Sequence, residues 1–211
     1  ALPILSEAGD AYRVSVEYDE DPAEVSNPRR YCNVSVIVGD VGRYYFGDER
    51  VTGTPEYARA QAAWRHFQKS TARDPFRSFA LWAGLALGAS VVVPLWASPE
   101  RGQFRLTAGA PDESGDGAIG AAFDTPRTRE ETGLTRPSLV KAGVTSEVTE
   151  YAAFLDGEVF GVIVERVTID EDGEPGDAGE IVDSLWGLIG EEYARSEADR
   201  MLAEWVNGSV S

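Results

Sequence analysis

A chain of 211 residues with 43% hydrophobic residues is long enough to bury a core and too apolar to be disordered. It carries 36 acidic and 19 basic residues, and the resulting formal charge of −17 disfavours direct binding to nucleic acid or to an anionic membrane. Cys32 and His66 are the only cysteine and histidine, which excludes a disulfide within the chain and metal sites that need several such side chains.

The opening segment, ALPILSEAGD, lacks the basic region and the long apolar stretch of a signal peptide. We therefore expect a soluble, cytoplasmic protein.

The first part of the chain predicts two strands, a turn with a short strand, and a helix. Apolar and polar residues alternate over residues 12–18, as in a half-buried strand. Residues 32–38 repeat the pattern, and residues 40–48 are typical of a turn with a short strand. A helix begins at Thr54, which is followed by proline and glutamate, and its buried stripe consists of Tyr57, Ala60, Trp64 and Phe67. His66 lies off this stripe, so we expect it to be exposed.

Residues 79–96, FALWAGLALGASVVVPLW, contain no charge and are the most apolar part of the chain. A membrane span is disfavoured because Gly84, Gly88 and Pro94 interrupt the run and residues 91–93 are all valine. We predict a buried helix over residues 75–88 that ends at glycine, followed by a buried strand over residues 90–96. On this prediction water reaches neither segment, and Leu85→Asp would unfold the protein.

The remaining elements follow the same reasoning. Strands are predicted over residues 103–106, 118–123, 158–168 and 181–186, with a polar connector through Pro137. Thr145 or Ser146 caps a helix that Gly157 ends, and the last helix spans residues 191–206 with an inward set of Tyr193, Ala194, Met201, Leu202 and Trp205. Residues 157–161 and 183–187 mix large apolar residues with glycines, which predicts that they lie side by side as strands beneath the central run.

Strands and helices do not alternate regularly, and no long linker divides the chain. The sequence therefore predicts an α+β fold in which a mainly antiparallel sheet is packed by three to four helices. Residues 1–211 are expected to form a single globular domain.

Four segments, EYDEDP with NPRRY, NVSVIVGDVGRYYFGD, SEVTEYAAFLDGEVFGVIVER and DSLWG, resemble a family of small proteins carried by phages and other mobile elements. The residues that match its motifs are Asn33, Tyr44, Gly47, Asp48, Glu147, Tyr151, Gly157, Val159, Gly161, Asp183, Ser184, Trp186 and Gly187. Family members carry histidines where this chain has Val41 and residues 98–102. If those histidines are catalytic, the resemblance implies that this chain has lost the chemistry.

One acidic loop has the spacing of calcium ligands. Asp112, Ser114 and Asp116 occupy its first, third and fifth places, and glycine follows at the sixth. The twelfth place, where a bidentate glutamate is expected, holds Phe123, with Asp124 beside it. A candidate Ca²⁺ site on these four oxygen-bearing residues thus competes with a solvated turn, and no other cofactor motif is present.

The acidity has two explanations: solubility in a salty cytoplasm, typical of a halophilic or GC-rich source, or imitation of a nucleic acid. Acidic residues occur in nearly every predicted loop, which predicts dispersed charge and favours the first explanation. The favoured function is that of a non-catalytic interaction protein of a virus or mobile element, with a protein partner. The alternatives are a nucleic-acid-mimicking inhibitor of a host defence or DNA-binding protein, and a small metal-dependent enzyme that uses carboxylates.

Overall fold

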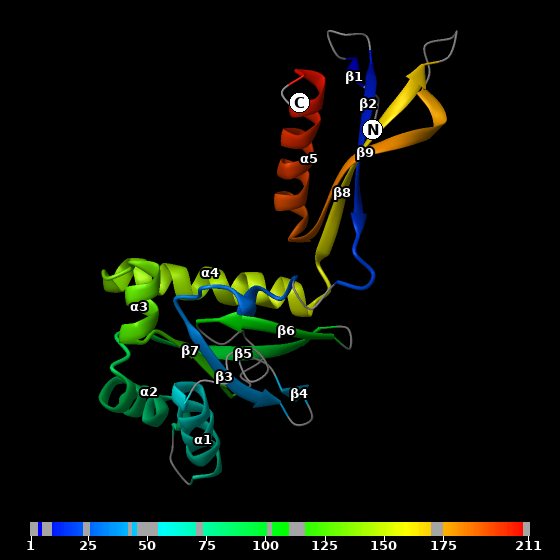
Figure 1. Ribbon diagram of the computed structural model, residues 1–211. Coiled ribbons are helices and arrows are strands. Elements are labelled where there is room, and N and C mark those ends of the chain that lie inside the picture. The colour runs from blue at the N-terminus through cyan, green and yellow to red at the C-terminus, as the bar shows by residue number, and fades with distance from the viewer. Residues whose placement is uncertain are drawn as a thin grey trace. The chain divides into compact units, whose positions relative to one another are not determined.

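The computed structural model describes residues 4–5, 10–22, 26–41, 44–45, 55–70, 74–100, 103–109, 117–169 and 175–208. The chain forms two compact units: unit 1 consists of Ala1–Ser26 and Gly157–Ser211, and unit 2 of Asn27–Asp156 (Figure 1). The single globular domain expected over residues 1–211 stays a prediction. The α+β class with antiparallel strands is confirmed.

Unit 2 is built on a five-stranded antiparallel sheet with the order β4-β3-β7-β5-β6. The strands are β3 (Val36–Val41), β4 (Tyr44–Tyr45), β5 (Val92–Glu100), β6 (Gln103–Ala108) and β7 (Gly120–Phe123). Since neighbouring residues of a strand point to opposite faces, Ile37 and Val38 contribute to two separate apolar clusters. The sheet is therefore buried on both faces.

Helices cover the two faces of this sheet. On one face lie α1 (Pro55–Lys69) and α2 (Pro75–Leu87), and on the other α4 (Pro137–Leu155), as Figure 1 shows. Two short elements complete the unit: the 3-10 helix η2 (Pro28–Arg30) and α3 (Pro126–Thr132). The stripe predicted for α1 is confirmed at Tyr57, Ala60 and Trp64, which are buried, and His66 is exposed as expected.

The central run forms a helix followed by a strand, as predicted, with Gly88 in the left-handed conformation (φ 70°) where α2 ends. The prediction that water reaches neither segment is wrong for α2. Phe79, Ala83 and Leu87 face the core, whereas Leu85 is 90% exposed and Leu81 63% exposed on the other side of the helix. The lack of charge concealed an ordinary amphipathic helix, because only every third or fourth side chain of a helix faces the sheet.

Unit 1 is a four-stranded antiparallel sheet with one helix. The sheet has the order β1-β2-β8-β9, formed by β1 (Ile4–Leu5), β2 (Ala11–Tyr18), β8 (Val159–Ile169) and β9 (Pro175–Ile189). The helix α5 (Glu191–Val206), red in Figure 1, packs on one face of this sheet. Its predicted bounds and its inward residues Ala194, Met201 and Leu202 are confirmed, but Tyr193 is 55% exposed.

The predicted pairing of the two glycine-bearing segments is confirmed, since β8 and β9 are neighbouring antiparallel strands. The central run belongs to unit 2, so its predicted place above these strands stays a prediction. Three other expectations were wrong: Cys32 is exposed and precedes β3, α4 begins at Pro137 rather than near Thr145, and α3 lies in the expected connector. No helix among the described residues is both long and apolar enough to cross a membrane.

Candidate functional site

A buried arginine organises the segment that leads into β3. Arg29 of η2 donates from Nη1 to the Asn33 side-chain oxygen (3.1 Å) and from Nη2 to the Ser35 carbonyl (2.7 Å). Its guanidinium also pairs with the Glu147 carboxylate of α4 at 3.4 Å. We call Arg29, Asn33, Ser35 and Glu147 the arginine cluster.

Glu147 is the acceptor that completes the arginine cluster. Its Oε1 accepts the backbone N–H of Val34 (2.6 Å), and its Oε2 accepts both the backbone N–H (2.9 Å) and the hydroxyl (2.6 Å) of Ser35. With both oxygens occupied by donors, this carboxylate is suited to holding the chain rather than to moving protons. We therefore assign a structural role to the arginine cluster.

Glu150 lies one turn further along α4, and its pKa is raised above the ordinary value. Partial burial is the main cause, the neighbouring Glu147 carboxylate adds to it, and the Arg29 guanidinium acts in the opposite direction. Glu150 is nevertheless an exposed side chain. A raised carboxyl pKa alone does not make an acid catalyst, because catalysis also needs partners placed to bind a substrate.

The predicted calcium ligands lie mostly outside the described residues, which include neither Asp112, Ser114 nor Asp116. The fourth, Asp124, is fully buried at the end of β7. Its carboxylate accepts the backbone N–H groups of Ser90 (2.9 Å) and Val91 (2.6 Å).

Asp124 also accepts the Ser90 hydroxyl and pairs with the Arg129 guanidinium of α3. It thereby fixes the turn between α2 and β5. Across the described part of the chain, no three acidic, histidine or cysteine side chains gather as a metal site. The Ca²⁺ loop stays a prediction.

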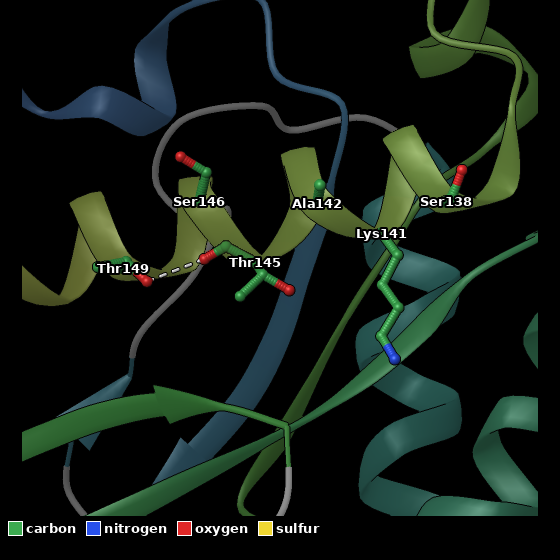
Figure 2. Close-up of a pocket in the computed structure, with 6 residues that line it drawn as sticks. All are labelled: Ser138, Lys141, Ala142, Thr145, Ser146 and Thr149. Atoms are coloured by element: carbon green, nitrogen blue, oxygen red, sulfur yellow. Dashed lines mark hydrogen bonds between the residues drawn. The ribbon is translucent and has the colours of Figure 1, made fainter.

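The exposed side of α4 lines a shallow cavity of about 590 Å³. Figure 2 shows its lining side chains, which recur every three or four residues: Ser138, Lys141, Ala142, Thr145, Ser146 and Thr149. The Thr149 hydroxyl donates to the Thr145 carbonyl (3.0 Å) of its own helix. Apart from Lys141, which carries the one charge of this lining, the side chains are small. They offer no arrangement that would select a ligand, so this cavity is not a strong candidate site.

The remaining motif residues divide between the two units. In unit 2, Tyr151 of α4 is buried in the apolar cluster between this helix and the sheet. Tyr44 lies in β4, and Gly47 and Asp48 are outside the described residues. In unit 1, Gly157 (φ 76°) and Gly187 (φ 82°) take left-handed backbone conformations that favour glycine. These positions are explained by backbone geometry.

Asp183 and Trp186 fix β9 to the elements on either side of it. The Asp183 carboxylate accepts the indole N–H of Trp205 in α5 at 3.4 Å. The Trp186 ring lies directly against Gly161 of β8: a Cβ atom added to that glycine would be 2.6 Å from ring carbon Cδ2, closer than real side chains approach. Because Gly161 has no side chain, the flat indole ring lies directly on the backbone of β8 at this position, which we call the seat of Trp186.

Trp186 lies on the sheet face that α5 leaves uncovered, which we call the open face. Residues 160, 162 and 164 of β8 point into the core beneath α5, so the alternate positions 161, 163 and 165 lie on the other face. Trp186 is 47% exposed there, and Ile181, which pairs with Glu165, is 61% exposed. An exposed indole that is held in place by its seat is typical of a binding surface.

Charge is distributed very unevenly between the two units. Unit 1 contains 21 of the 36 acidic residues but only 4 of the 19 basic ones, so its formal charge is −17. Unit 2 contains 15 of each and is formally neutral. Acidic residues do occur throughout the chain, as predicted, but the net charge is not dispersed, because the arginines and lysines are concentrated in unit 2.

No family model, curated protein or solved structure matches this chain. The features of the chain that bear on its function are the charge of unit 1 and the exposed apolar side chains of its open face. The sequence analysis identified Trp186 as a motif residue but missed the charge difference, which becomes visible only when the two units are known.

Proposed function

We propose that this chain is a non-catalytic interaction protein and that unit 1 is the part that binds a basic protein partner. The observation that carries the proposal is that the whole net charge of −17 belongs to unit 1. Charge needed only for solubility serves equally well on any exposed surface, so an even distribution would be expected. Concentrated charge of one sign instead attracts and orients a partner of the opposite sign.

The arrangement of the carboxylates in unit 1 supports this proposal. On α5, Arg195 pairs with Glu191, and Arg200 pairs with Glu197 and Glu204. These exposed pairs use half of the four basic residues of unit 1 and leave most of its carboxylates in excess. A basic partner would relieve that repulsion on binding.

The setting in a virus or mobile element comes from the resemblance of the motif segments, and the cytoplasm remains the expected compartment. The same charge concentration favours a second candidate, a nucleic-acid mimic that occupies the DNA-binding surface of its partner. The metal-dependent enzyme stays a prediction that depends on residues 112–116.

The test compares two double variants of the full chain that change the net charge equally. Glu20→Lys with Glu158→Lys alters exposed residues of unit 1, and Glu130→Lys with Glu131→Lys alters exposed residues of unit 2. Binding of a labelled 12-residue peptide with six arginines is followed by fluorescence anisotropy at 50 and 150 mM salt.

We expect the unit 1 variant to weaken binding about tenfold at 50 mM salt and the unit 2 variant to weaken it less than twofold, since screening at this salt concentration limits the reach of each charge to about 14 Å. Equal losses, or no binding by the unaltered chain at either salt concentration, would contradict the proposal. For the mimicry candidate, the chain should displace labelled duplex DNA from a basic DNA-binding protein. Simultaneous binding of chain and DNA would reject that candidate.

A further inference from the structure

The open face of unit 1 has the chemistry to receive an arginine side chain, and its central feature is the seated indole. Trp186 presents its outer side to solvent while its inner side covers Gly161. Tryptophan is the aromatic side chain that attracts a cation most strongly over its face. Because the ring already lies flat on the sheet, little conformational entropy is lost when a partner stacks on it.

A carboxylate lies beside this ring. Glu17 of β2 is the direct cross-strand partner of Gly161, and side chains at such positions point to the same face with Cβ atoms about 5 Å apart. Glu17 is exposed, and among the described residues its carboxylate accepts only the Ser15 hydroxyl, at 3.3 Å. A cation above Trp186 would therefore have a negative charge within reach.

A second described carboxylate of this face is already neutralised. Glu165, two residue pairs further along the strand, is bound by the Arg13 guanidinium through Nε (2.9 Å) and Nη2 (2.8 Å). This pair is an example within the same sheet of how an arginine occupies a carboxylate on this face. Among the described residues, Glu17 is therefore the carboxylate beside the indole that has no cationic partner.

We propose that Trp186 and Glu17 form the docking point for an arginine of the basic partner, whose guanidinium stacks on the indole and hydrogen-bonds the carboxylate. Arginine fits better than lysine because its planar group can stack and donate two parallel hydrogen bonds at once. A second exposed apolar side chain of this face, Ile181, lies roughly 13 Å away along the strands at 3.3 Å per residue, a distance that several residues of the partner can span.

This inference rests on the proposed function, because the charge of −17 in unit 1 is the reason for choosing a basic protein as the occupant. An acidic partner would be repelled before it reached the indole, and a neutral one would gain no attraction from this charge. The seat and Glu17 then determine where on unit 1 the partner binds.

The test uses the full chain and three 12-residue peptides that carry arginine, lysine or uncharged citrulline at six positions. Trp186→Ala and Glu17→Gln alter the docking point. The matched controls are Tyr193→Ala, which removes another exposed aromatic side chain, and Glu192→Gln, which removes another exposed carboxylate. Far-UV circular dichroism checks that each variant is folded, and Trp186→Phe replaces Trp186→Ala if the latter is not.

We expect the arginine peptide to bind at least threefold more tightly than the lysine peptide, and the citrulline peptide not to bind. Trp186→Ala should weaken binding of the arginine peptide five- to tenfold, with about twofold for Trp186→Phe, and Glu17→Gln about threefold. Both controls should remain within twofold of the unaltered chain.

Three failures are distinguishable. If the arginine peptide binds but Trp186→Ala and Glu17→Gln behave like their controls, the docking point is wrong while the proposed function stands. If the arginine and lysine peptides bind equally, the assignment to arginine is overturned. If the citrulline peptide binds as well as the arginine peptide, charge does not drive binding and the proposed function itself fails.

Discussion

Replacing Glu147 by glutamine should strongly destabilise unit 2, because it removes the carboxylate that pairs with the buried Arg29 guanidinium. The Arg29 side chain is 1% exposed and that of Glu147 is 18% exposed. Removal of one partner of a buried ion pair typically costs about 3 to 5 kcal/mol. Asn33 and Ser35 still accept hydrogen bonds from Arg29, so we expect the lower limit, about 3 kcal/mol.

The loss of hydrogen bonds at the backbone points in the same direction. Glu147 uses both oxygens to receive the N–H groups of Val34 and Ser35, whereas glutamine has one acceptor oxygen and places an NH₂ group against a donor. With a urea dependence of about 2 kcal/mol per molar, the unfolding midpoint should fall by about 1.5 M.

Urea unfolding followed by tryptophan fluorescence measures this shift, and hydrogen exchange of peptides from α4 and β3 assigns it to unit 2. Glu150→Gln is the matched control, since it makes the same chemical change one turn away on the same helix. A midpoint shift below about 0.3 M for Glu147→Gln, or an equal shift for Glu150→Gln, would refute the reasoning.

Two further predictions concern α2 and α4. Leu85→Asp should leave the unfolding free energy within about 0.5 kcal/mol, because Leu85 is exposed, whereas Phe79→Ala should cost about 3 to 5 kcal/mol; equal losses in thermal melts would contradict the assigned faces of α2. The pKa of Glu150 is raised in the folded state, so its ionised form opposes folding at neutral pH and protonation at lower pH removes that cost. Glu150→Gln should therefore increase stability at pH 7, and this gain should vanish at acid pH. Urea midpoints measured from pH 7 to pH 3.5 test this. A difference in midpoint between the variant and the unaltered chain that is the same at every pH would show that Glu150 is not the titrating group.

The elements that the sequence predicted best carry their own boundary signals. The range 191–206 for α5 was correct because a glycine precedes it and acidic residues fill its first turn. The missed helix α3 also has such signals, since Thr125 and Thr128 form a capping box and Pro126 follows the cap. Its composition instead predicts a connector, because the segment is polar and short.

The features that could not be predicted depend on contacts between distant residues. Arg29 and Glu147 are 118 positions apart, and neither has a local pattern that indicates burial. The division into two units is similarly hidden, because unit 1 is assembled from both ends of the chain and no linker composition marks the junctions at residues 26 and 157. The seat of Trp186 was within reach, since the glycine-rich segments were expected to be neighbours, but its exposure was not.

That discontinuous construction has a consequence for how the chain folds during synthesis. Every residue of β2 pairs with a residue of β8 more than 140 positions later, so β2 must wait until nearly the whole chain has emerged from the ribosome. At 5 to 20 residues per second, the delay is roughly 7 to 30 s. Closing a loop of that length costs about 3 kcal/mol more than closing a hairpin turn.

Unit 2 can remove most of that cost if it folds first. The contact between Arg29, two residues inside the start of unit 2, and Glu147 of its last helix brings the two ends of the inserted segment toward each other. The pairing of β2 with β8 then begins from a short connection instead of a long loop. Until that moment the edge of β2 that receives β8 remains unpaired, and the acidic residues Glu17, Asp19, Glu20 and Asp21 at the end of the strand provide charge repulsion against aggregation.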